Sequence, residues 1–276
     1  GRDFLLIRGE NKLENITSRT NAKIKFALSL RDDAAARRKN NMFFIEGARL
    51  CSDALKSGVS VLQFFFTESA QKKFPEVCAA LLSFAKESYK ISTDVALRLG
   101  DTKSPQGIFC VCSAVDKIYK ADKIDFAGKY VLLENVQDPS NIGSAARTAE
   151  ALGIDGLIVC GGCDVFNPKA LRASMGAFFR LNIFVCDDAP SFLKSAGEGG
   201  MLTLASTPSA KAEKITDLCF DGGVICVVGN EGNGVEKRTM DACKTLATIP
   251  MRGRAESLNA STAAAILMWE MVRHGD

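Results

Sequence analysis

Short apolar runs alternate with stretches of helical periodicity along nearly the whole chain. Runs of four to eight apolar residues bounded by glycine or proline are typical of buried strands, and an intervening helical pattern is typical of a crossover to a parallel strand. The alternation therefore predicts an α/β protein with largely parallel sheets. Strands are expected at 43–47, 61–66, 88–91, 107–113, 129–134, 156–160, 182–186, 201–206, 223–229 and 245–251.

The length of 276 residues suggests two domains, since a domain holds about 150 residues. A charged stretch with weaker periodicity, residues 116–127, separates the two series of predicted strands and is interpreted as a linker. We therefore expect a smaller α/β domain at 1–115, with a helix over 21–38, and a second α/β domain at 128–276 that ends in a long apolar helix.

The histidine and cysteine content excludes several kinds of chemistry. The single histidine, His274, stands at the third position from the end, which leaves no partner for a Ser-His-Asp triad, a Cys-His pair or a zinc motif. Most of the ten cysteines lie in apolar runs, which indicates buried thiols in a reducing compartment. Cys160 and Cys163 form a CxxC pair without a second pair, so free thiols at a strand end are favoured over zinc or redox chemistry. We expect no metal.

Hydropathy and charge bear on location and partner. No apolar run reaches the roughly 18 residues that span a bilayer, and the first residues lack the apolar core of a signal peptide, so we expect a cytoplasmic protein without membrane contact. Residues 1–40 contain ten Lys and Arg against five Asp and Glu, whereas the rest of the chain is close to neutral. This asymmetry favours RNA or DNA as a partner over a merely solvated helix face.

The first of three unusual segments covers residues 133–153. A strand ends, Asp138 and Pro139 predict a turn, and a helix begins near Asn141, where an asparagine caps free N–H groups. Arg147 stands alone among small residues on this helix. Arginine suits phosphate binding, although a single arginine more often forms a surface ion pair.

The second segment, residues 227–235, runs from a buried strand into a glycine-rich loop. Its GxxGxG spacing differs from the dinucleotide and P-loop patterns, and Glu231 would repel a phosphate. The loop therefore suits a neutral or cationic ligand, although the segment taken alone is better interpreted as a tight turn from a strand to a helix. The third segment, 249–273, is a strand, a polar turn with Ser257, Asn259 and Ser261 as possible caps, and a helix so apolar that it predicts burial in a core or a dimer interface.

In this order and spacing, the three segments resemble the SpoU family of RNA 2′-O-ribose methyltransferases, within the knotted SPOUT superfamily. The resemblance covers about 128–276. The matching residues are Asp138, Pro139, Asn141, Gly143, Arg147, Thr148, Gly153, Ser174, Gly176, Ala177, Gly229, Glu231, Gly232, Ile249, Pro250, Met251, Glu256, Ser257, Leu258 and Asn259.

Residues 16–25 and 44–50 resemble the L30e-like substrate-binding domain that these enzymes often carry. The resemblance implies that this domain binds RNA. The candidate contacts are its basic residues Arg19, Lys23, Lys25, Arg37, Arg38 and Arg49.

The resemblance also implies a trefoil knot, a homodimer with active sites completed across subunits, and S-adenosylmethionine as the methyl donor. The implied cofactor-binding residues are Ser206, Thr207, Gly229, Asn230, Gly232, Ile249, Met251, Ser257 and Leu258. The implied catalytic residues are Arg147, Asn141, Glu231, Ser257 and Asn259. A guanidinium is a poor base because it stays protonated, so Arg147 is expected to grip a phosphate, and the role of Glu231, base or organiser, is open.

The implied substrate is structured RNA, with 23S ribosomal RNA favoured over transfer RNA. One alternative from another class is a noncatalytic RNA-binding or ribosome-assembly protein, against which the intact Arg147, Glu231, Ser257 and Asn259 argue.

Overall fold

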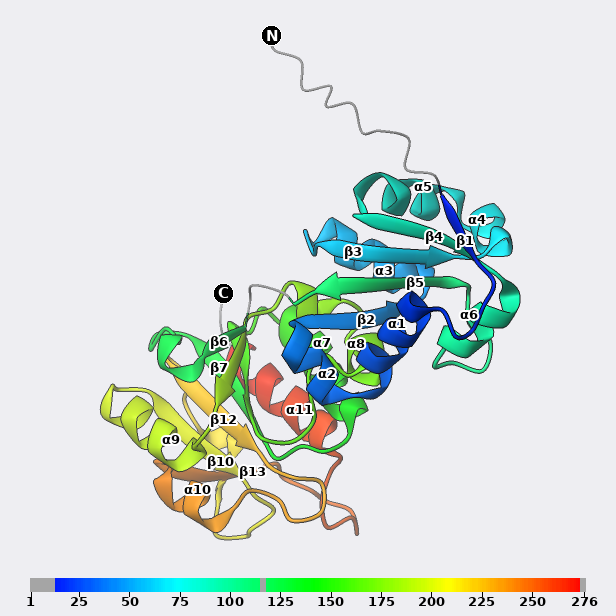
Figure 1. The fold of residues 1–276 in the computed structure, drawn as a ribbon. Coiled ribbons are helices and arrows are strands. Elements are labelled where there is room, and N and C mark those ends of the chain that lie inside the picture. Colours follow the sequence, from blue (N-terminus) through cyan, green and yellow to red (C-terminus); the bar gives the residue numbers. More distant parts are fainter. Residues whose placement is uncertain (1–12, 115–117, 274–276) are drawn as a thin grey trace. The chain divides into compact units, whose positions relative to one another are not determined.

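The computed structural model describes residues 13–114 and 118–273, so His274 lies outside the described part. The chain divides into two compact units, residues 1–114 and 115–276, which are described separately (Figure 1). None of the described helices has the length and hydrophobicity needed to cross a bilayer.

The first unit is built on a five-stranded sheet in the order β1-β4-β3-β5-β2. Its strands are β1 (Glu14–Ile16), β2 (Met42–Glu46), β3 (Val61–Phe66), β4 (Glu87–Ile91) and β5 (Ile108–Ser113). β1 and β3 pair with β4 in parallel, but β5 runs antiparallel to both β2 and β3. This sheet is therefore mixed, and the expectation of largely parallel pairing is wrong for it.

In the described part of this unit, six helices accompany the sheet, and the expected helix over 21–38 is two helices. They are α1 (Ala22–Asp32), α2 (Ala34–Asn40), α3 (Ala48–Lys56), α4 (Glu68–Lys73), α5 (Pro75–Phe84) and α6 (Thr93–Leu99). The break falls at Asp33, whose backbone is extended and whose carboxylate accepts a hydrogen bond from the Ala35 N–H at 2.8 Å. An aspartate that caps a new helix in this way ends the preceding one.

The second unit contains an eight-stranded sheet in the order β11-β13-β10-β12-β7-β8-β9-β6, and every pair in it is parallel. The strands are β6 (Ile118–Lys120), β7 (Lys129–Glu134), β8 (Gly156–Cys160), β9 (Ile183–Cys186), β10 (Leu202–Ser206), β11 (Glu213–Lys214), β12 (Val224–Val228) and β13 (Thr245–Thr248). Pairing of this kind confirms the predicted parallel α/β architecture for this half of the chain.

Much of the segment interpreted as a linker belongs to the second unit. Residues 118–120 form the edge strand β6, which pairs with β9, and residues 121–123 form a 3₁₀ turn. Ala121 and Ile124 are buried in the core of the second unit. These apolar side chains recur every three residues among charged ones, and their burial draws the segment onto the sheet edge.

Helices cover both faces of the large sheet (Figure 1). They are α7 (Pro139–Ala151), α8 (Pro168–Ala173), α9 (Ala189–Glu198), α10 (Lys237–Ala242) and α11 (Ala260–Val272). α7 packs against α8 and α11, whereas α9 packs against α10. Since both faces are buried, the strands are apolar throughout rather than alternating.

The strand order determines where a ligand can bind. β13, β10 and β12 are neighbours, and their parallel pairing brings their carboxyl ends to one edge of the sheet. Ligands of open α/β sheets bind beyond the carboxyl ends of the strands. The segments that follow Ser206, Val228 and Thr248 therefore meet there.

Candidate active site

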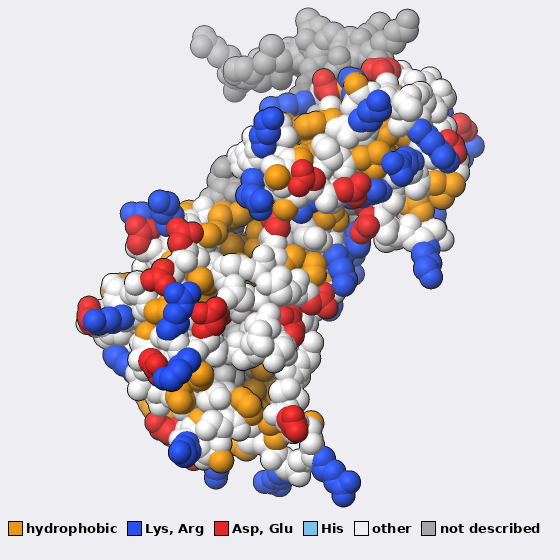
Figure 2. Space-filling model, turned by 60° about the horizontal axis from the view of Figure 1, so that its bottom comes forward, with side chains coloured by type: hydrophobic (Ala, Val, Ile, Leu, Met, Phe, Trp, Pro, Cys, Tyr) orange, Lys and Arg blue, Asp and Glu red, His pale blue; other side chains and the backbone are white. Residues whose placement is uncertain are grey.

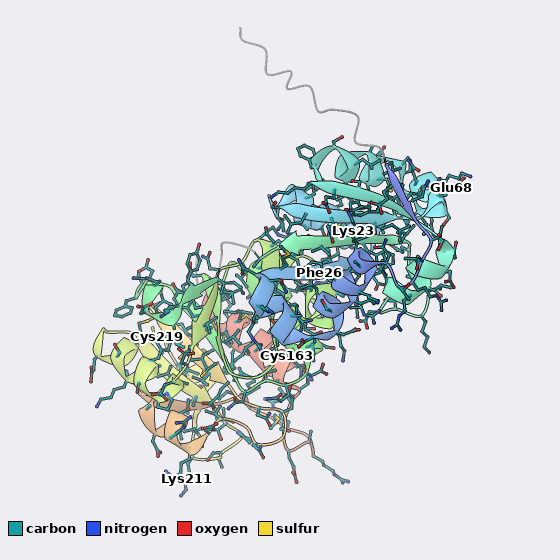
Figure 3. All side chains as sticks on the ribbon, in the orientation of Figure 1. Lys23, Phe26, Glu68, Cys163, Lys211 and Cys219 are labelled. Carbon is teal, nitrogen blue, oxygen red and sulfur yellow. The ribbon has the colours of Figure 1, made fainter. Side chains whose placement is uncertain are left out.

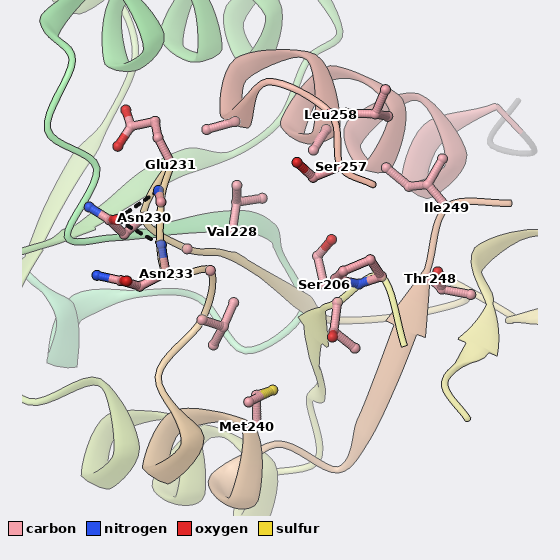
Figure 4. A pocket seen from close by; sticks show the side chains of 18 of the residues that line it. Ser206, Val228, Asn230, Glu231, Asn233, Met240, Thr248, Ile249, Ser257 and Leu258 are labelled. Carbon is pink, nitrogen blue, oxygen red and sulfur yellow. Dashed lines mark hydrogen bonds between the residues drawn. The ribbon is translucent and has the colours of Figure 1, made fainter. Parts of the chain in front are cut away.

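A pocket of about 390 Å³ lies where these three strands end (Figure 4). Its walls come from the chain after β10, the glycine loop after β12, the chain after β13 and the start of α11. The structure brings all nine residues predicted to bind the cofactor together as lining residues: Ser206, Thr207, Gly229, Asn230, Gly232, Ile249, Met251, Ser257 and Leu258. The sequence analysis missed further lining residues, which are Pro208, Val228, Asn233, Gly234, Val235, Met240, Thr248, Ala260 and Ala263.

The glycine loop is closed by its own backbone. Asn230 and Gly234 exchange N–H···O bonds of 3.1 and 2.9 Å, and the Asn230 side chain accepts from the N–H groups of Gly232 and Asn233 at 2.9 and 3.1 Å (Figure 4). At Gly229 a Cβ would lie 2.1–2.2 Å from backbone atoms of Gly234 and Val235. Glycine is therefore required at position 229 because the two ends of the loop approach so closely.

The glycine loop and the residues after it are also held by hydrogen bonds to Glu134 and Asn135, which were not predicted as site residues. The buried Glu134 accepts hydrogen bonds from the Glu236 N–H at 2.8 Å and from the Thr239 hydroxyl. Asn135, at a positive φ of 51°, donates to Glu236 at 2.9 Å, and its carbonyl accepts from Asn230 at 2.9 Å. The sequence signal was a glutamate that ends a strand and is followed directly by an asparagine.

The lining favours a ligand without phosphate. Among the lining residues Glu231 is the single charged one, and neither Lys nor Arg contributes. The Glu231 carboxylate points away from Ile249 and Leu258 in Figure 4, so it turns from the interior towards α7. The groups left to contact a ligand in the pocket interior include apolar side chains, two serine hydroxyls and the backbone groups of the glycine loop. A volume of this size is typical of small-molecule sites, and this lining suits a neutral or cationic nucleoside-like ligand.

Glu231, Asn141 and Asn259 form a chain of hydrogen bonds that joins the three unusual segments. Asn259 Nδ2 donates to Asn141 Oδ1 at 2.9 Å, and Asn141 Nδ2 donates to Glu231 Oε1 at 2.8 Å. The carboxylate also accepts from the N–H groups of Gln137 and Asp138, each at 3.1 Å. Asn259 caps α11 through Ser261 and Thr262, as anticipated. α7, however, is capped by Asp138 and begins at Pro139, so Asn141 is not its cap.

These contacts hold Glu231 in its ionised form. Burial raises the pKa of the carboxyl, but the hydrogen bonds from Asn141, Gln137 and Asp138 outweigh burial and leave the pKa below its usual range. A carboxylate that is easily ionised and already accepts three hydrogen bonds is a poor proton acceptor. The geometry therefore favours an organising role for Glu231 over that of a base.

Replacing Glu231 with glutamine is expected to lower stability in a pH-dependent way. Because the folded pKa is the lower one, the carboxylate contributes stability that is fully present above the unfolded pKa of about 4.3 and is lost as pH falls through the folded pKa. Denaturant titrations should give a wild-type advantage that is constant above about pH 5 and shrinks below about pH 4. Glu198→Gln, on an exposed residue of α9, is the control. A difference that stays constant down to pH 3 would contradict this assignment.

Arg147 lies outside the pocket formed by its own chain. It is exposed on α7 and is not a lining residue, and no described residue forms a hydrogen bond or ion pair with its side chain. The neighbouring Gly143 explains how α7 sits so close to α8, since a Cβ there would lie 2.4 Å from the Ala170 carbonyl. The structure thus brings four of the five predicted catalytic residues together and leaves Arg147 apart.

The six basic residues predicted to contact RNA in the first unit fall into three groups. Arg37 is buried and donates to the carbonyls of Leu30 and Arg31 at 2.7 and 3.0 Å, so it joins α1 to α2 and the prediction that it contacts RNA is withdrawn. Lys23 contacts Tyr89 and lies 3.7 Å from Glu14 and 3.8 Å from Glu87 (Figure 3). The exposed members of this set are Arg19, Lys25, Arg38 and Arg49. Of these, Arg19 pairs with Asp94, and Arg49 lies 3.9 Å from Asp53.

All ten cysteines are free thiols, and Cys160 ends β8. Its strand neighbour is Cys186 rather than Cys163, whose Sγ contacts the Asp164 carbonyl at 3.5 Å. Across the described ranges, no three His, Cys, Asp or Glu side chains group so as to hold a metal ion.

The fold and pocket together define an α/β enzyme that binds a nucleoside-like ligand at the carboxyl edge of a parallel sheet. Residues 128–269 match the SpoU rRNA methylase family, and residues 21–110 match the MRM3-like substrate binding domain. The chain therefore belongs to the SpoU rRNA methylase family.

Relatives match over almost the full chain. The 23S rRNA (guanosine(2553)-2′-O)-methyltransferase RlmP of Bacillus subtilis is 30% identical, with 94% of this chain and 99% of the relative covered. The 23S rRNA (uridine(2479)-2′-O)-methyltransferase of Streptomyces viridochromogenes is 29% identical, with coverage of 96% and 95%. The crystal structure of an AdoMet-bound rRNA methyltransferase from Sinorhizobium meliloti superposes with a TM-score of 0.82 at 26% identity, covering 96% of this chain and 99% of the other.

Proposed function

We propose that this protein transfers a methyl group from S-adenosylmethionine to a ribose 2′-hydroxyl of RNA, and that its substrate is 23S ribosomal RNA. The observation that carries the proposal is the pocket, which is lined by the second and third family segments and by no basic side chain, and to which Asn141 of the first segment is joined by its hydrogen bond to Glu231. Two relatives that match nearly the full chain are 23S rRNA 2′-O-methyltransferases, and the Sinorhizobium meliloti structure contains AdoMet. We propose a cytoplasmic location, which the 23S rRNA substrates of the bacterial relatives support.

The pocket residues fit S-adenosylmethionine by their chemistry. The cofactor is cationic at sulfur and lacks phosphate, as the lining requires. Ile249 and Leu258 offer apolar surface to the adenine ring, the glycine loop offers backbone groups, and Ser206 and Ser257 offer hydroxyls. Bound S-adenosylmethionine supplies an activated methyl group, and the chain supplies binding and orientation.

The predicted catalytic residues divide into a hydrogen-bonded network beside the pocket and an unpaired cation, Arg147. Asn141, Glu231 and Asn259 hold the glycine loop against α7 and α11, and Ser257 stands at the pocket wall next to Asn259. Arg147 grips a phosphate beside the target ribose and so orients the 2′-hydroxyl. Its guanidinium stays protonated and therefore does not accept the proton.

A homodimer would bring Arg147 to a pocket. Helix α11 presents a stripe of exposed and half-buried residues at helical spacing: Thr262, Ala265, Ile266, Trp269 and Val272. Trp269 is 55% exposed, which is unusual for a side chain this large and apolar. We assign the stripe to a second copy of the chain. Since α7 packs against α11, Arg147 then serves the partner's pocket.

Trp269→Glu is expected to convert the dimer to a monomer, because an isologous interface would bury two carboxylates at its centre. Light scattering coupled to size exclusion measures the mass. Phe84→Glu, at an aromatic residue of the first unit that is 67% exposed, should leave the mass unchanged. A monomeric wild type, or a Trp269→Glu variant that stays dimeric, would contradict the assignment.

The first unit is assigned to RNA capture through Arg19, Lys23, Lys25, Arg38 and Arg49. The division of labour at the boundary near residue 115 and the trefoil knot remain predictions from the family resemblance.

The deciding experiment incubates purified protein with labelled S-adenosylmethionine and unmethylated in vitro transcripts of 23S ribosomal RNA and of transfer RNA. Methyl transfer to the ribosomal transcript, mapped to a 2′-oxygen, supports the proposal. Transfer to the tRNA alone would move the substrate to transfer RNA. RNA binding without transfer would indicate a noncatalytic RNA-binding or ribosome-assembly protein.

A further inference from the structure

The arginines of the second unit differ in whether they have partners. Arg180, Arg238 and Arg273 form ion pairs with Glu150, Glu236 and Glu270 at the surface. Within the described part of the chain, the side chains of Arg147, Arg252 and Arg254 form neither a hydrogen bond nor an ion pair, and Arg172 does have a partner. The unpaired arginines thus belong to the segments that build the site.

Arg252 and Arg254 flank the pocket without entering it. Met251, next to Arg252, and Ser257, three residues after Arg254, both line the pocket. Residues 250–259 are exposed throughout, so these side chains project into solvent beside the opening. The Cα atoms of two residues that are two positions apart lie within about 7 Å of each other, which suits neighbouring phosphates of one nucleic acid strand.

Besides Arg252 and Arg254, a third cation near the opening, Lys211, lies on the chain after β10. Thr207 and Pro208 line the pocket, and the exposed Lys211 follows them (Figure 3), with no ion-pair partner for its ammonium among the described residues. Long basic side chains project from the lower end of the second unit in Figure 2. We call Lys211, Arg252 and Arg254 the rim cations. Glu256 is the acidic residue of the 250–258 segment, so that segment keeps a net charge of +1.

The distribution of charge indicates that the pocket interior and its rim bind different chemical groups. The pocket interior has no basic residue and so disfavours phosphate, whereas its rim has three cations free to bind one. An exposed arginine that has no acidic partner keeps all five of its N–H donors available for an oxyanion such as a phosphate. A polyanion that crosses the opening would contact the rim while one of its sugars faces the interior.

We propose that Arg252 and Arg254, assisted by Lys211, clamp the phosphates of the RNA strand that flank the target nucleotide over the pocket. This inference rests on the proposed function, because it assumes an RNA strand at the opening. It adds a phosphate-binding surface in the catalytic unit to the RNA capture assigned to the first unit. The rim cations are positioning residues that present the ribose to the pocket.

The test uses the full chain with Arg252→Glu and Arg254→Glu combined. Binding to an unmodified 23S rRNA transcript should weaken about tenfold or more near 0.1 M salt. The slope of log K against log salt should become shallower by about 1.4–1.8, since each lost phosphate contact removes about 0.7–0.9. S-adenosylhomocysteine affinity, measured by calorimetry, should stay within about twofold, because neither side chain lines the pocket.

A matched variant combines Lys120→Glu and Lys123→Glu, which change the net charge equally. Both lysines are exposed, on and beside β6, at the sheet edge four strands from β12. RNA binding that weakens equally in both double variants, or in neither, would overturn the clamp. Arg252→Lys with Arg254→Lys should retain most of the salt slope and lose part of the affinity, which distinguishes contact from unfolding.

Failure of the clamp and failure of the proposed function give different results. If wild type methylates the transcript but Arg252→Glu with Arg254→Glu binds RNA and methylates it as wild type does, the clamp is wrong and the function stands. If wild type transfers no methyl group, yet this variant alone loses RNA affinity and salt dependence, the clamp stands and the function is wrong.

Discussion

Arg147→Ala is expected to reduce methyl transfer about a hundredfold or more while leaving S-adenosylhomocysteine affinity within about twofold. The reason is that Arg147 is exposed, lies outside the pocket of its own chain and forms no hydrogen bond or ion pair with another described residue, so its removal should leave the lining intact. What it removes is the cation that orients the ribose. Arg147→Lys should restore little activity, because lysine keeps the charge but not the planar fork.

The control for Arg147 is Arg180→Ala. Arg180 is also exposed, and it donates a hydrogen bond at 2.6 Å to Glu150, which lies on α7, the helix that carries Arg147. Its loss should cost at most about 1 kcal/mol of stability and little activity. Single-turnover rates with 23S rRNA transcript measure the effect. Full activity in Arg147→Ala would exclude the residue from catalysis, and loss of cofactor affinity would show that it supports the pocket.

Gly229→Val is expected to abolish S-adenosylhomocysteine binding and, with it, methyl transfer. A Cβ at this position would lie 2.1 Å from the Gly234 carbonyl carbon and 2.2 Å from the Val235 nitrogen. These are backbone atoms of the closed loop, so the loop itself must move, and with it the lining between Gly229 and Val235. Calorimetry should show affinity lowered by about two orders of magnitude or lost.

Gly253→Ala is the matched control for Gly229→Val. A Cβ at Gly253 meets nothing within 4 Å, and the position does not need a positive φ. This variant should bind the cofactor product as wild type does. Thermal unfolding checks that Gly229→Val remains folded, which the helices packed on both faces of the sheet favour. Unchanged cofactor affinity in a folded Gly229→Val protein would exclude the loop from the site.

Mixing the two inactive proteins tests whether Arg147 acts across the dimer. A mixed dimer of Arg147→Ala and Gly229→Val subunits has one site in which an intact pocket meets an intact arginine. Random exchange should therefore restore about a quarter of the wild-type rate, since half of the dimers are mixed and each has one complete site. If Arg147 serves its own pocket, neither site is complete and no activity returns.

The pocket was accessible from sequence because its parts are local. Each wall is a strand followed by a short turn, and Gly229, Ile249 and Leu258 were predicted from that pattern together with the family resemblance. Parallel pairing then brings the carboxyl ends of β10, β12 and β13 to one edge without further information. The repeated apolar runs in the second half likewise determined a parallel sheet covered on both faces.

Other features depend on contacts between distant residues. The Glu231 carboxylate turns away from the pocket because Asn141 and two backbone N–H groups about 90 positions earlier bind it. Arg37 looks like an RNA contact in a basic segment, yet the carbonyls at the end of α1 bury it.

Throughout the chain, features that depend on neighbouring residues could be predicted from the sequence, whereas features that depend on contacts between distant residues could not. The sequence by itself determined the strands of four or more residues, the glycine loop and the chemistry of the pocket, since backbone period, turn residues and burial are set by near neighbours, whereas the shorter strands β1, β6 and β11 were not predicted. Only the tertiary structure decided which side chains find partners, and so which become structural, as Arg37 did, and which stay free, as Arg147, Arg252 and Arg254 did. A charged group bonds whatever acceptor the fold brings within reach, and that acceptor is usually far away in the sequence.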